Sequence, residues 1–232
     1  MGIGGTGETG AMAEGPPYQD RSHAGAILAR RLLHYAGRDD VVVLALPRGG
    51  VPVGYEVARA LGVGLDVFLV RKLGVPGHEE LAMGAIASAG VRVVNPEVVT
   101  ALGIDDSTVD AVVEREEQEL ARRDHQFRQG RPPPEVAGKV VILVDDGLAT
   151  GASMRAAVAL ARQQGPHRIV VAVPTGASAI CDELAGEVDE VHCVASPTPF
   201  HAVGLAYRQF PQMTDEEVCL LMDAASEPEG YR

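Results

Sequence analysis

The stretch VVILVDDGLATGASMRAA, Val140 to Ala157, decides the fold that we expect for this chain. An apolar, largely β-branched run ends abruptly in Asp145 and Asp146, and a glycine-containing segment then leads into a helix-favouring sequence from Met154. That order predicts a buried strand, a loop and a helix N-terminus. Carboxylates in such a loop can hold hydroxyl groups or a metal ion, and backbone N–H groups at the helix N-terminus can hold a phosphate.

Similar apolar runs lie on both sides of this stretch, and helical segments separate them. We expect strands over 41–46, 65–70, 140–145, 168–173 and 188–195, with two short strands over 85–94. We expect helices over 22–35, 105–127, 151–164 and 177–186, with Ser22 capping the first. A further helix is expected to have Pro52 in its first turn and to end at Leu61. Apolar strands that alternate with helices are typical of a parallel sheet covered on both faces. The predicted fold class is α/β, an open, mainly parallel twisted sheet flanked by helices, with a small C-terminal hood.

The domain organisation follows from composition and periodicity. Residues 1–17 are rich in Gly, Thr and Pro without periodicity, which predicts a flexible tail. We expect an α/β core over 18–195 with a helical insertion at 96–130, whose charged face, including Glu116, is solvated. Residues 196–232 are expected to form the hood and a last helix capped by Thr214, as part of the same domain.

The overall composition of the chain limits the cellular locations and the binding partners that we expect. The 232 residues are 46% hydrophobic, with no apolar run near the roughly 20 residues that span a bilayer. The N-terminus lacks the basic and apolar regions of a secretory signal, and the three cysteines are scattered. We therefore expect a cytoplasmic protein with free thiols and no membrane partner. A net charge of −12 is a poor match to nucleic acid, so we expect no nucleic-acid partner.

Residues 140–153 resemble the 5-phosphoribosyl pyrophosphate (PRPP) signature of the type I phosphoribosyltransferases: apolar residues, two acids, a spacer and Thr-Gly-x-Ser/Thr. In that family the acids hold the ribose 2′- and 3′-hydroxyls, and the loop holds the 5′-phosphate. The resemblance gives the first role to Asp145 and Asp146. It gives the second to Gly147, Leu148, Ala149, Thr150, Gly151, Ala152 and Ser153. The family's 6-oxopurine enzymes usually carry aspartate at the position of Ala149, so this acceptor class is disfavoured.

Two further loops resemble the same family, and each follows a predicted strand. Arg48, Gly49 and Gly50 resemble the pyrophosphate loop, which often contains a cis non-proline peptide, although Pro-Arg-Gly-Gly by itself is a common surface turn. Arg71 and Lys72 resemble the basic pair that precedes a mobile catalytic loop, which we expect over 71–81. Their charges would stabilise a departing pyrophosphate. Glu79 or Glu80 could act as general acid or base, and a solvated loop is the alternative.

The hood concentrates the scarce aromatic residues of the chain. In the family a variable hood covers the site and selects the acceptor. Phe200 and Tyr207 are the candidates for stacking on a flat base. The alternative is a satellite hydrophobic cluster that ties down the C-terminal part.

The resemblance implies that a nitrogen nucleophile, expected on a nucleobase, displaces pyrophosphate from C1 of PRPP. It implies Mg²⁺ as cofactor, held by Asp145 and Asp146 indirectly through ribose or water, and it allows a homodimer. Two other functions stay open. One is a non-catalytic PRPP sensor of nucleotide metabolism. The other is a phosphoacceptor domain that binds Mg²⁺ through acids after a strand, which leaves the Thr-Gly-Ala-Ser segment unexplained. The catalytic hypothesis requires both acids to share one cleft with Arg48.

Overall fold

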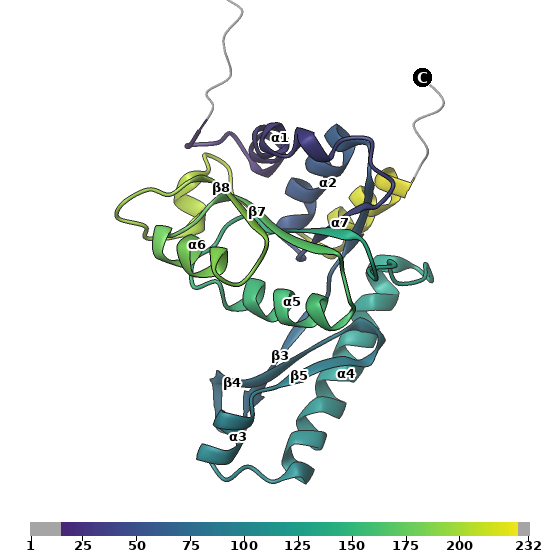
Figure 1. The fold of residues 1–232 in the computed structure, drawn as a ribbon, viewed down its shortest axis with the longest axis vertical. Coiled ribbons are helices and arrows are strands. Elements are labelled where there is room, and N and C mark those ends of the chain that lie inside the picture. Colours follow the sequence, from purple (N-terminus) through teal and green to yellow (C-terminus); the bar gives the residue numbers. More distant parts are fainter. Residues whose placement is uncertain (1–14, 227–232) are drawn as a thin grey trace, which may run out of the picture.

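The computed structural model describes residues 15–226, apart from the side chains of residues 79, 80 and 89, so most of the tail expected over 1–17 lies outside the described residues. The main sheet has five strands in the order β2-β1-β6-β7-β8, and every neighbouring pair is parallel (Figure 1). The strands are β1 (Val41–Ala45), β2 (Gly64–Val67), β6 (Val140–Val144), β7 (Arg168–Thr175) and β8 (Glu190–Ala195). This topology confirms the open, mainly parallel sheet predicted from the sequence.

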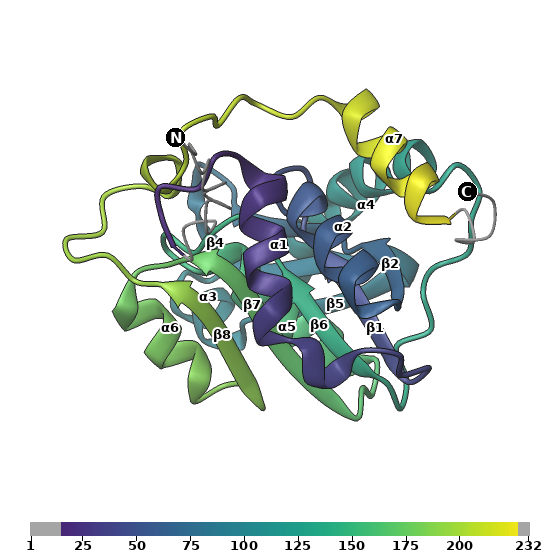
Figure 2. The same cartoon turned by 90° about the horizontal axis from the view of Figure 1, so that it is seen from above.

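Helices cover both faces of this sheet (Figure 2). One face packs against α1 (Arg21–Arg31) and α2 (Gly50–Leu61), and the other against α5 (Ala152–Gln163) and α6 (Ser178–Ala185). Successive strand residues point to opposite faces of the sheet. Ile142 therefore packs in the core under α1 and α2, and Leu143 packs in the core under α5 and α6. Because both faces are buried, the strands are continuously apolar rather than alternating.

The prediction of a mobile loop over 71–81 is wrong, because this segment forms a β-hairpin. A second sheet pairs β3 (Val70–Val75), β4 (His78–Ala87) and β5 (Val91–Val94) in antiparallel order. Leu73 and Val75 alternate into the core, and Gly77 supplies the turn with φ +79°. The two strands expected over 85–94 are confirmed, with the short 3₁₀ helix η2 (Ser88–Gly90) between them. The strand expected over 65–70 is split, since β2 ends at Val67 and β3 begins at Val70.

Two helices from the predicted insertion pack on this second sheet, at the bottom of Figure 1: α3 (Pro96–Ala101) and α4 (Asp106–Arg128). The side chain of Arg128, at the end of α4, is 2% exposed. It donates to Asp66 Oδ1 at 3.1 Å, to the Val67 carbonyl at 2.8 Å and to Asp124. These bonds attach α4 to the edge of the main sheet, at β2.

The C-terminal part returns to the start of the described chain. After β8 and the 3₁₀ helix η3 (Val203–Ala206), the backbone bonds to Tyr18 through Ala206 and Arg208, each at 2.8 Å. The last helix, α7 (Asp215–Ser226), then packs against α2 and α4. Thr214 caps it as expected, because Thr214 Oγ1 accepts from the Glu217 N–H at 3.2 Å.

The start of the first helix differs from the prediction. Asp20, not Ser22, is the N-cap of α1, and its carboxylate accepts from the His23 N–H at 2.8 Å. The helix ends at Arg31, and the remainder of the predicted span forms the 3₁₀ helix η1 (Leu33–Tyr35). Between residues 15 and 226, no helix combines the length and the apolar character needed to cross a membrane.

Candidate functional site

The loops that follow β1 and β6 meet at the carboxyl end of the main sheet. The Leu46 N–H donates to the Val144 carbonyl at 2.9 Å. A Cβ atom added at Gly49 would overlap Oδ2 of Asp146, and one added at Gly50 would lie 2.7 Å from the Val144 carbonyl. Only glycine therefore lets the two loops approach this closely. The Pro47–Arg48 peptide is cis, as the resemblance led us to expect.

Asp145 and Asp146 sit half-buried at this junction. Asp145 Oδ1 accepts from the Asp146 N–H at 2.8 Å. Burial, and then the neighbouring Asp146 carboxylate, raise the pKa of Asp145 well above its ordinary value. Burial also raises the pKa of Asp146, against the opposing effect of Arg21. The pair therefore retains a proton more readily than exposed carboxyls, and a ligand that donates hydroxyl hydrogen bonds would favour its ionised form.

Sequence reasoning missed Arg21, the cation that contacts this pair. Arg21 Nε donates to Asp146 Oδ2 at 2.8 Å, and Nη1 donates to the Pro211 carbonyl at 2.8 Å. Its guanidinium lies 3.8 Å from the ring centroid of Phe210. Arg21 precedes Asp146 by 125 residues and begins an ordinary helix, so no local pattern identifies it. It fixes one carboxylate oxygen of Asp146 and joins the hood to the acid pair.

The loop after Asp146 ends in an open helix N-terminus. Gly151 is the N-cap of α5 with φ +70° and has no side chain to cap the helix, although Thr150 Oγ1 accepts from the Ala152 N–H at 3.4 Å. The Leu148 N–H donates to the Thr175 carbonyl at 2.9 Å, and the Ala177 N–H donates to the Leu148 carbonyl at 3.0 Å. These two bonds hold the loop against the end of β7. Four of the expected phosphate-binding residues are exposed here: Ala149, Thr150, Ala152 and Ser153. The first turn of α5 is therefore accessible to an anion.

The structure separates the basic pair of the sequence. Arg71 and Lys72 are neighbours on β3, so their side chains point to opposite faces. Arg71 lines a cavity of about 100 Å³ together with Pro47, Asp145 and Ser153, whereas Lys72 is exposed and does not line it. The side chain of Glu79 lies outside the described residues. Of these candidates, the structure brings Arg71 to the acid pair.

Glu116 of α4 holds Arg71 beside this cavity. Its Oε2 accepts from Arg71 Nη2 at 2.6 Å, and its Oε1 lies 3.2 Å from Arg115 Nε. The expectation of a solvated Glu116 is wrong, because the residue is only 8% exposed. Helical periodicity alone placed it on the charged face, and the packing of α4 against the second sheet buries it.

The side chain of Arg48 is turned toward the last helix. It lines a hollow with Thr214 and Asp215 rather than the cavity that contains Asp145, so that cavity is not the cleft shared with Arg48 that the sequence led us to expect. Arg48 Nη1 is 3.6 Å from Asp215 Oδ1 at the start of α7, and both side chains are about one-third exposed. An exposed pair of this kind contributes at most about 1 kcal/mol. Arg48 can therefore leave Asp215 for an anion held by the neighbouring glycines at little cost.

The sequence left two roles open for the aromatic residues of the hood, stacking on a base or forming a satellite hydrophobic cluster, and the structure treats these residues differently. Tyr207 is 6% exposed and packs with Tyr18 and Ile27 in a satellite cluster. Its hydroxyl donates to the Asp146 carbonyl at 2.5 Å, and burial raises its pKa. Its ring thus supports the acid loop from the protein side rather than presenting an open face to a base. Phe200 is half-buried in the loop after β8, and Phe210, 37% exposed, stacks on Tyr207.

Comparison with known families gives one match over most of the chain. The model of the phosphoribosyl transferase domain family matches residues 19–196. A Mycobacterium tuberculosis protein with the provisional name of phosphoribosyl transferase is 49% identical over 208 residues, 90% of this chain and 47% of that protein. The chain thus spans about half the length of this curated relative. The bifunctional protein PyrR of Chloroflexus aurantiacus is 33% identical over 129 residues, 54% of this chain and 65% of that protein.

Among solved structures, the chain is similar to TT1426 from Thermus thermophilus. The two share 42% identity and superpose with a TM-score of 0.82, over 90% of this chain and 99% of that one. The similarity therefore includes the main sheet, the second sheet and their connections.

Proposed function

Since the chain belongs to the phosphoribosyl transferase domain family, we propose that it transfers the 5-phosphoribosyl group of PRPP to a nitrogen nucleophile on a nucleobase-like acceptor, releasing pyrophosphate. One observation carries the proposal. Gly49 and Gly50 pack directly on Asp145 and Asp146, and the open N-terminus of α5 follows the same acids. Two loops that would bind anions thus flank a carboxylate pair, which fits a sugar whose diol lies between a phosphate and a pyrophosphate.

The binding roles follow from this arrangement. Asp145 and Asp146 would accept hydrogen bonds from the ribose 2′- and 3′-hydroxyls, and the loop over 147–153 would hold the 5′-phosphate. The backbone N–H group of Gly49, with Arg48, would hold the pyrophosphate. The Gly50 N–H donates to the Leu46 carbonyl at 3.0 Å, so Gly50 would contribute the close approach of the two loops rather than a donor. Arg71 is a further candidate, because it lines the cavity that contains Asp145. Lys72 is left out of the proposed site because it lies on the other face of β3.

The acid pair also fits Mg²⁺, which prefers carboxylate and other oxygen ligands. In the proposal, Asp145 and Asp146 hold the ion indirectly, through ribose hydroxyls or water. When bound with PRPP, Mg²⁺ would neutralise charge on the pyrophosphate and fix its orientation.

The residues of the chain would act by positioning and electrostatics rather than by covalent chemistry. As the bond from C1 to the pyrophosphate breaks, negative charge grows on the leaving group. Arg48 and the N–H group of Gly49 would stabilise that charge. The hood residues, with Phe200 on the loop after β8, would limit water and select the acceptor.

A Gly49→Ala substitution should weaken PRPP binding about 10-fold or more. The added methyl would overlap the carboxylate of Asp146, so either the acid or the pyrophosphate loop must move. Titration calorimetry with PRPP and Mg²⁺ measures the change. Gly37→Ala is a control for the added methyl, because a Cβ at Gly37 meets nothing within 4 Å, although its φ of +69° makes some loss of stability expected. Unchanged PRPP affinity in Gly49→Ala would argue against a site at this junction.

PRPP binding should release protons. Burial keeps the pKa of Asp145 well above 3.8 in the free protein, and hydroxyl donors favour the ionised pair. Affinity should therefore rise with pH from about the ordinary carboxyl value to the raised pKa, and level off above it. Calorimetry near the raised pKa in two buffers of different ionisation enthalpy measures the released protons. Proton uptake, or an affinity that falls as pH rises through this window, would contradict the proposed contact.

The test of the function is a panel of nucleobases incubated with PRPP and Mg²⁺, scored by pyrophosphate release. Release that depends on one base establishes both the transfer and the acceptor. Tight PRPP binding with no release across the panel would favour the non-catalytic sensor, which uses the same loops. The proposal includes a cytoplasmic location and allows a homodimer.

A further inference from the structure

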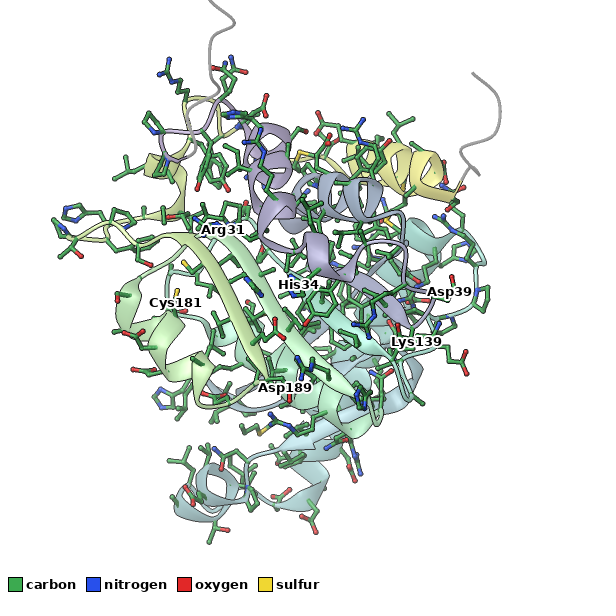
Figure 3. The ribbon with its side chains drawn as sticks, turned by 45° about the horizontal axis from the view of Figure 1, so that its top comes forward. Arg31, His34, Asp39, Lys139, Cys181 and Asp189 are labelled. Carbon is green, nitrogen blue, oxygen red and sulfur yellow. The ribbon has the colours of Figure 1, made fainter. Side chains whose placement is uncertain are left out.

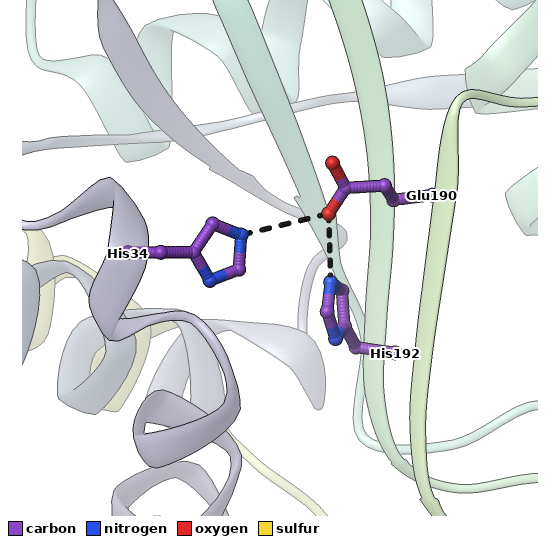
Figure 4. Close-up of side chains that lie close together, drawn as sticks. All are labelled: His34, Glu190 and His192. Atoms are coloured by element: carbon purple, nitrogen blue, oxygen red, sulfur yellow. Dashed lines mark hydrogen bonds and ion pairs between the residues drawn. The ribbon is translucent and has the colours of Figure 1, made fainter.

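Three potential metal-binding side chains meet away from the proposed PRPP site. They are His34 of η1, which follows α1, and Glu190 and His192 of β8 (Figure 4). His192 Nε2 lies 3.0 Å from Glu190 Oε2, and His34 Nε2 lies 3.6 Å from the same oxygen. One ligand atom from each residue lies within 4.8 Å of the other two. Two imidazoles thus converge on a single carboxylate oxygen.

The strand register explains this convergence. Glu190, His192 and Val194 are alternate residues of β8 and share one face, and Val194 packs on the core beneath α1 and α2. β8 is the edge strand, so this face is only partly covered. Figure 3 shows His34 on the segment after α1, on the same side of the sheet as Arg31. The side chains of His34, Glu190 and His192 are 53%, 26% and 22% exposed, so the cluster is open to solvent.

Two neighbours fix the orientation of Glu190. Its Oε1 accepts from the Tyr35 hydroxyl at 2.8 Å and from Arg168 Nη1 at 2.5 Å. Tyr35 is 2% exposed and cannot move freely. These bonds occupy Oε1 and leave Oε2 facing the two imidazoles. Outer hydrogen bonds of this kind commonly orient the carboxylate ligands of metal ions.

We propose that His34, Glu190 and His192 bind a divalent transition-metal ion of the zinc class. Two imidazole nitrogens and one carboxylate oxygen form a donor set typical of such ions. Metal–ligand distances near 2.1 Å place tetrahedral ligands about 3.4 Å apart. The separations of 3.0 and 3.6 Å in the cluster bracket that value. Because the His34 side chain is exposed, it can move closer to Glu190 and His192 when an ion binds. The fourth coordination position is open to water or an external ligand.

The proposed metal site is independent of the proposed transfer reaction. Glu190 begins β8, whereas Asp145 follows the end of β6, and the strands of this sheet run parallel. The two sites therefore lie toward opposite ends of the sheet. The positive charge of Arg168 opposes the metal, but Arg168 donates to Oε1 of Glu190, whereas the ion would bind Oε2. If the 43% exposed Arg168 side chain turned into solvent, the buried Tyr35 hydroxyl would still hold Oε1. A bound ion would link η1 to the sheet edge and stabilise the folded chain.

The test uses chelator-treated protein titrated with Zn²⁺ by calorimetry, and with Co²⁺ by visible absorption. We expect one ion per chain, a ligand-field spectrum without a thiolate charge-transfer band, and a higher unfolding temperature with Zn²⁺. His34→Gln and His192→Gln should each weaken binding at least about 10-fold, and the double variant should abolish it. His125→Gln, at an exposed position on α4, is the matched control and should bind like the wild type.

Circular dichroism of the metal-free variants shows whether each still folds. Should His192→Gln fail to fold, the half-exposed His34→Gln decides the question. Wild-type protein that binds no Zn²⁺ at sub-millimolar concentration overturns the proposal. So does a double variant that binds as tightly as the wild type. Either result would make the cluster an ion-pair network only.

Discussion

Asp146→Asn is expected to reduce acceptor-dependent pyrophosphate release at least about 100-fold while the fold stays intact. In the proposed function, the carboxylate of Asp146 would accept from a ribose hydroxyl, and it already accepts from Arg21 Nε at 2.8 Å. An amide has one acceptor oxygen in place of two, and its NH₂ group takes the place of the other, so either Arg21 or the ribose hydroxyl loses a charged acceptor. It also removes the negative charge next to Arg21. Steady-state kcat/KM with PRPP and the identified acceptor measures the loss.

The control for this change is Asp39→Asn, at an exposed position that precedes β1 at the other end of the sheet. It removes the same charge and should leave kcat/KM unchanged. Far-UV circular dichroism and the unfolding temperature establish that both variants are folded. Wild-type turnover in Asp146→Asn would contradict the assigned role. A different result would favour the sensor. In that case the wild type binds PRPP without turnover on any base, and Asp146→Asn loses the binding.

Arg128→Met should lower the free energy of unfolding by about 3–5 kcal/mol, because it leaves the half-buried carboxylate of Asp66, 16% exposed, without its cation. Arg128 is 2% exposed and bonds to Asp66, to Asp124 and to the Val67 carbonyl. Methionine fills similar volume but restores none of these bonds. For a chain of this length the loss corresponds to a fall of roughly 10 °C in the unfolding temperature. Denaturant unfolding followed by circular dichroism measures it.

The pH dependence of that loss identifies its cause. Burial already raises the pKa of Asp66 with Arg128 present, and removal of the cation should raise it further. A protonated Asp66 needs no cation, so the difference between variant and wild type should shrink as pH falls toward 4. Arg122→Met is the control, because Arg122 is 59% exposed and its solvent-screened pair with Glu119 should contribute little to stability. A constant difference between pH 4 and 7 would exclude the unpaired Asp66 as the cause.

The bonds that attach α4 to the main sheet should also affect the proposed site. The same helix carries Glu116, which holds Arg71 at the cavity that contains Asp145. If α4 loosens, Arg71 loses its buried partner. We therefore expect residual turnover in Arg128→Met to fall before the main sheet unfolds on heating.

The parallel sheet and its principal loops could be predicted from local sequence. Five-residue apolar runs bounded by glycine, proline or acids are enough to place β1 and β6, since strands buried on both faces tolerate few polar residues. The order of strand, acids, glycine and helix likewise placed Asp145, Asp146 and the N-terminus of α5 on one edge. Parallel strands carry their following loops at the same end, so this part of the site needed no tertiary information.

The hairpin was missed because its signal is weak. Between Val70 and Val75, the alternation of apolar residues is interrupted by Arg71, Lys72 and Gly74, a composition that also suits a charged loop. The strand forms because β4 supplies hydrogen-bond partners and α4 covers Leu73 and Val75. Both contacts come from segments that local sequence does not place next to β3.

Side-chain partners were decided by tertiary structure alone. Arg21 and Asp146 are 125 residues apart, Arg71 and Glu116 are 45 apart, and Tyr207 reaches the Asp146 carbonyl across 61 residues. Hydrophobic periodicity and turn chemistry act over a few residues, and they specify which segments become strands, helices and loops. Which charge meets which carboxylate depends on how those finished elements pack, because a buried ion needs a partner from whichever surface covers it.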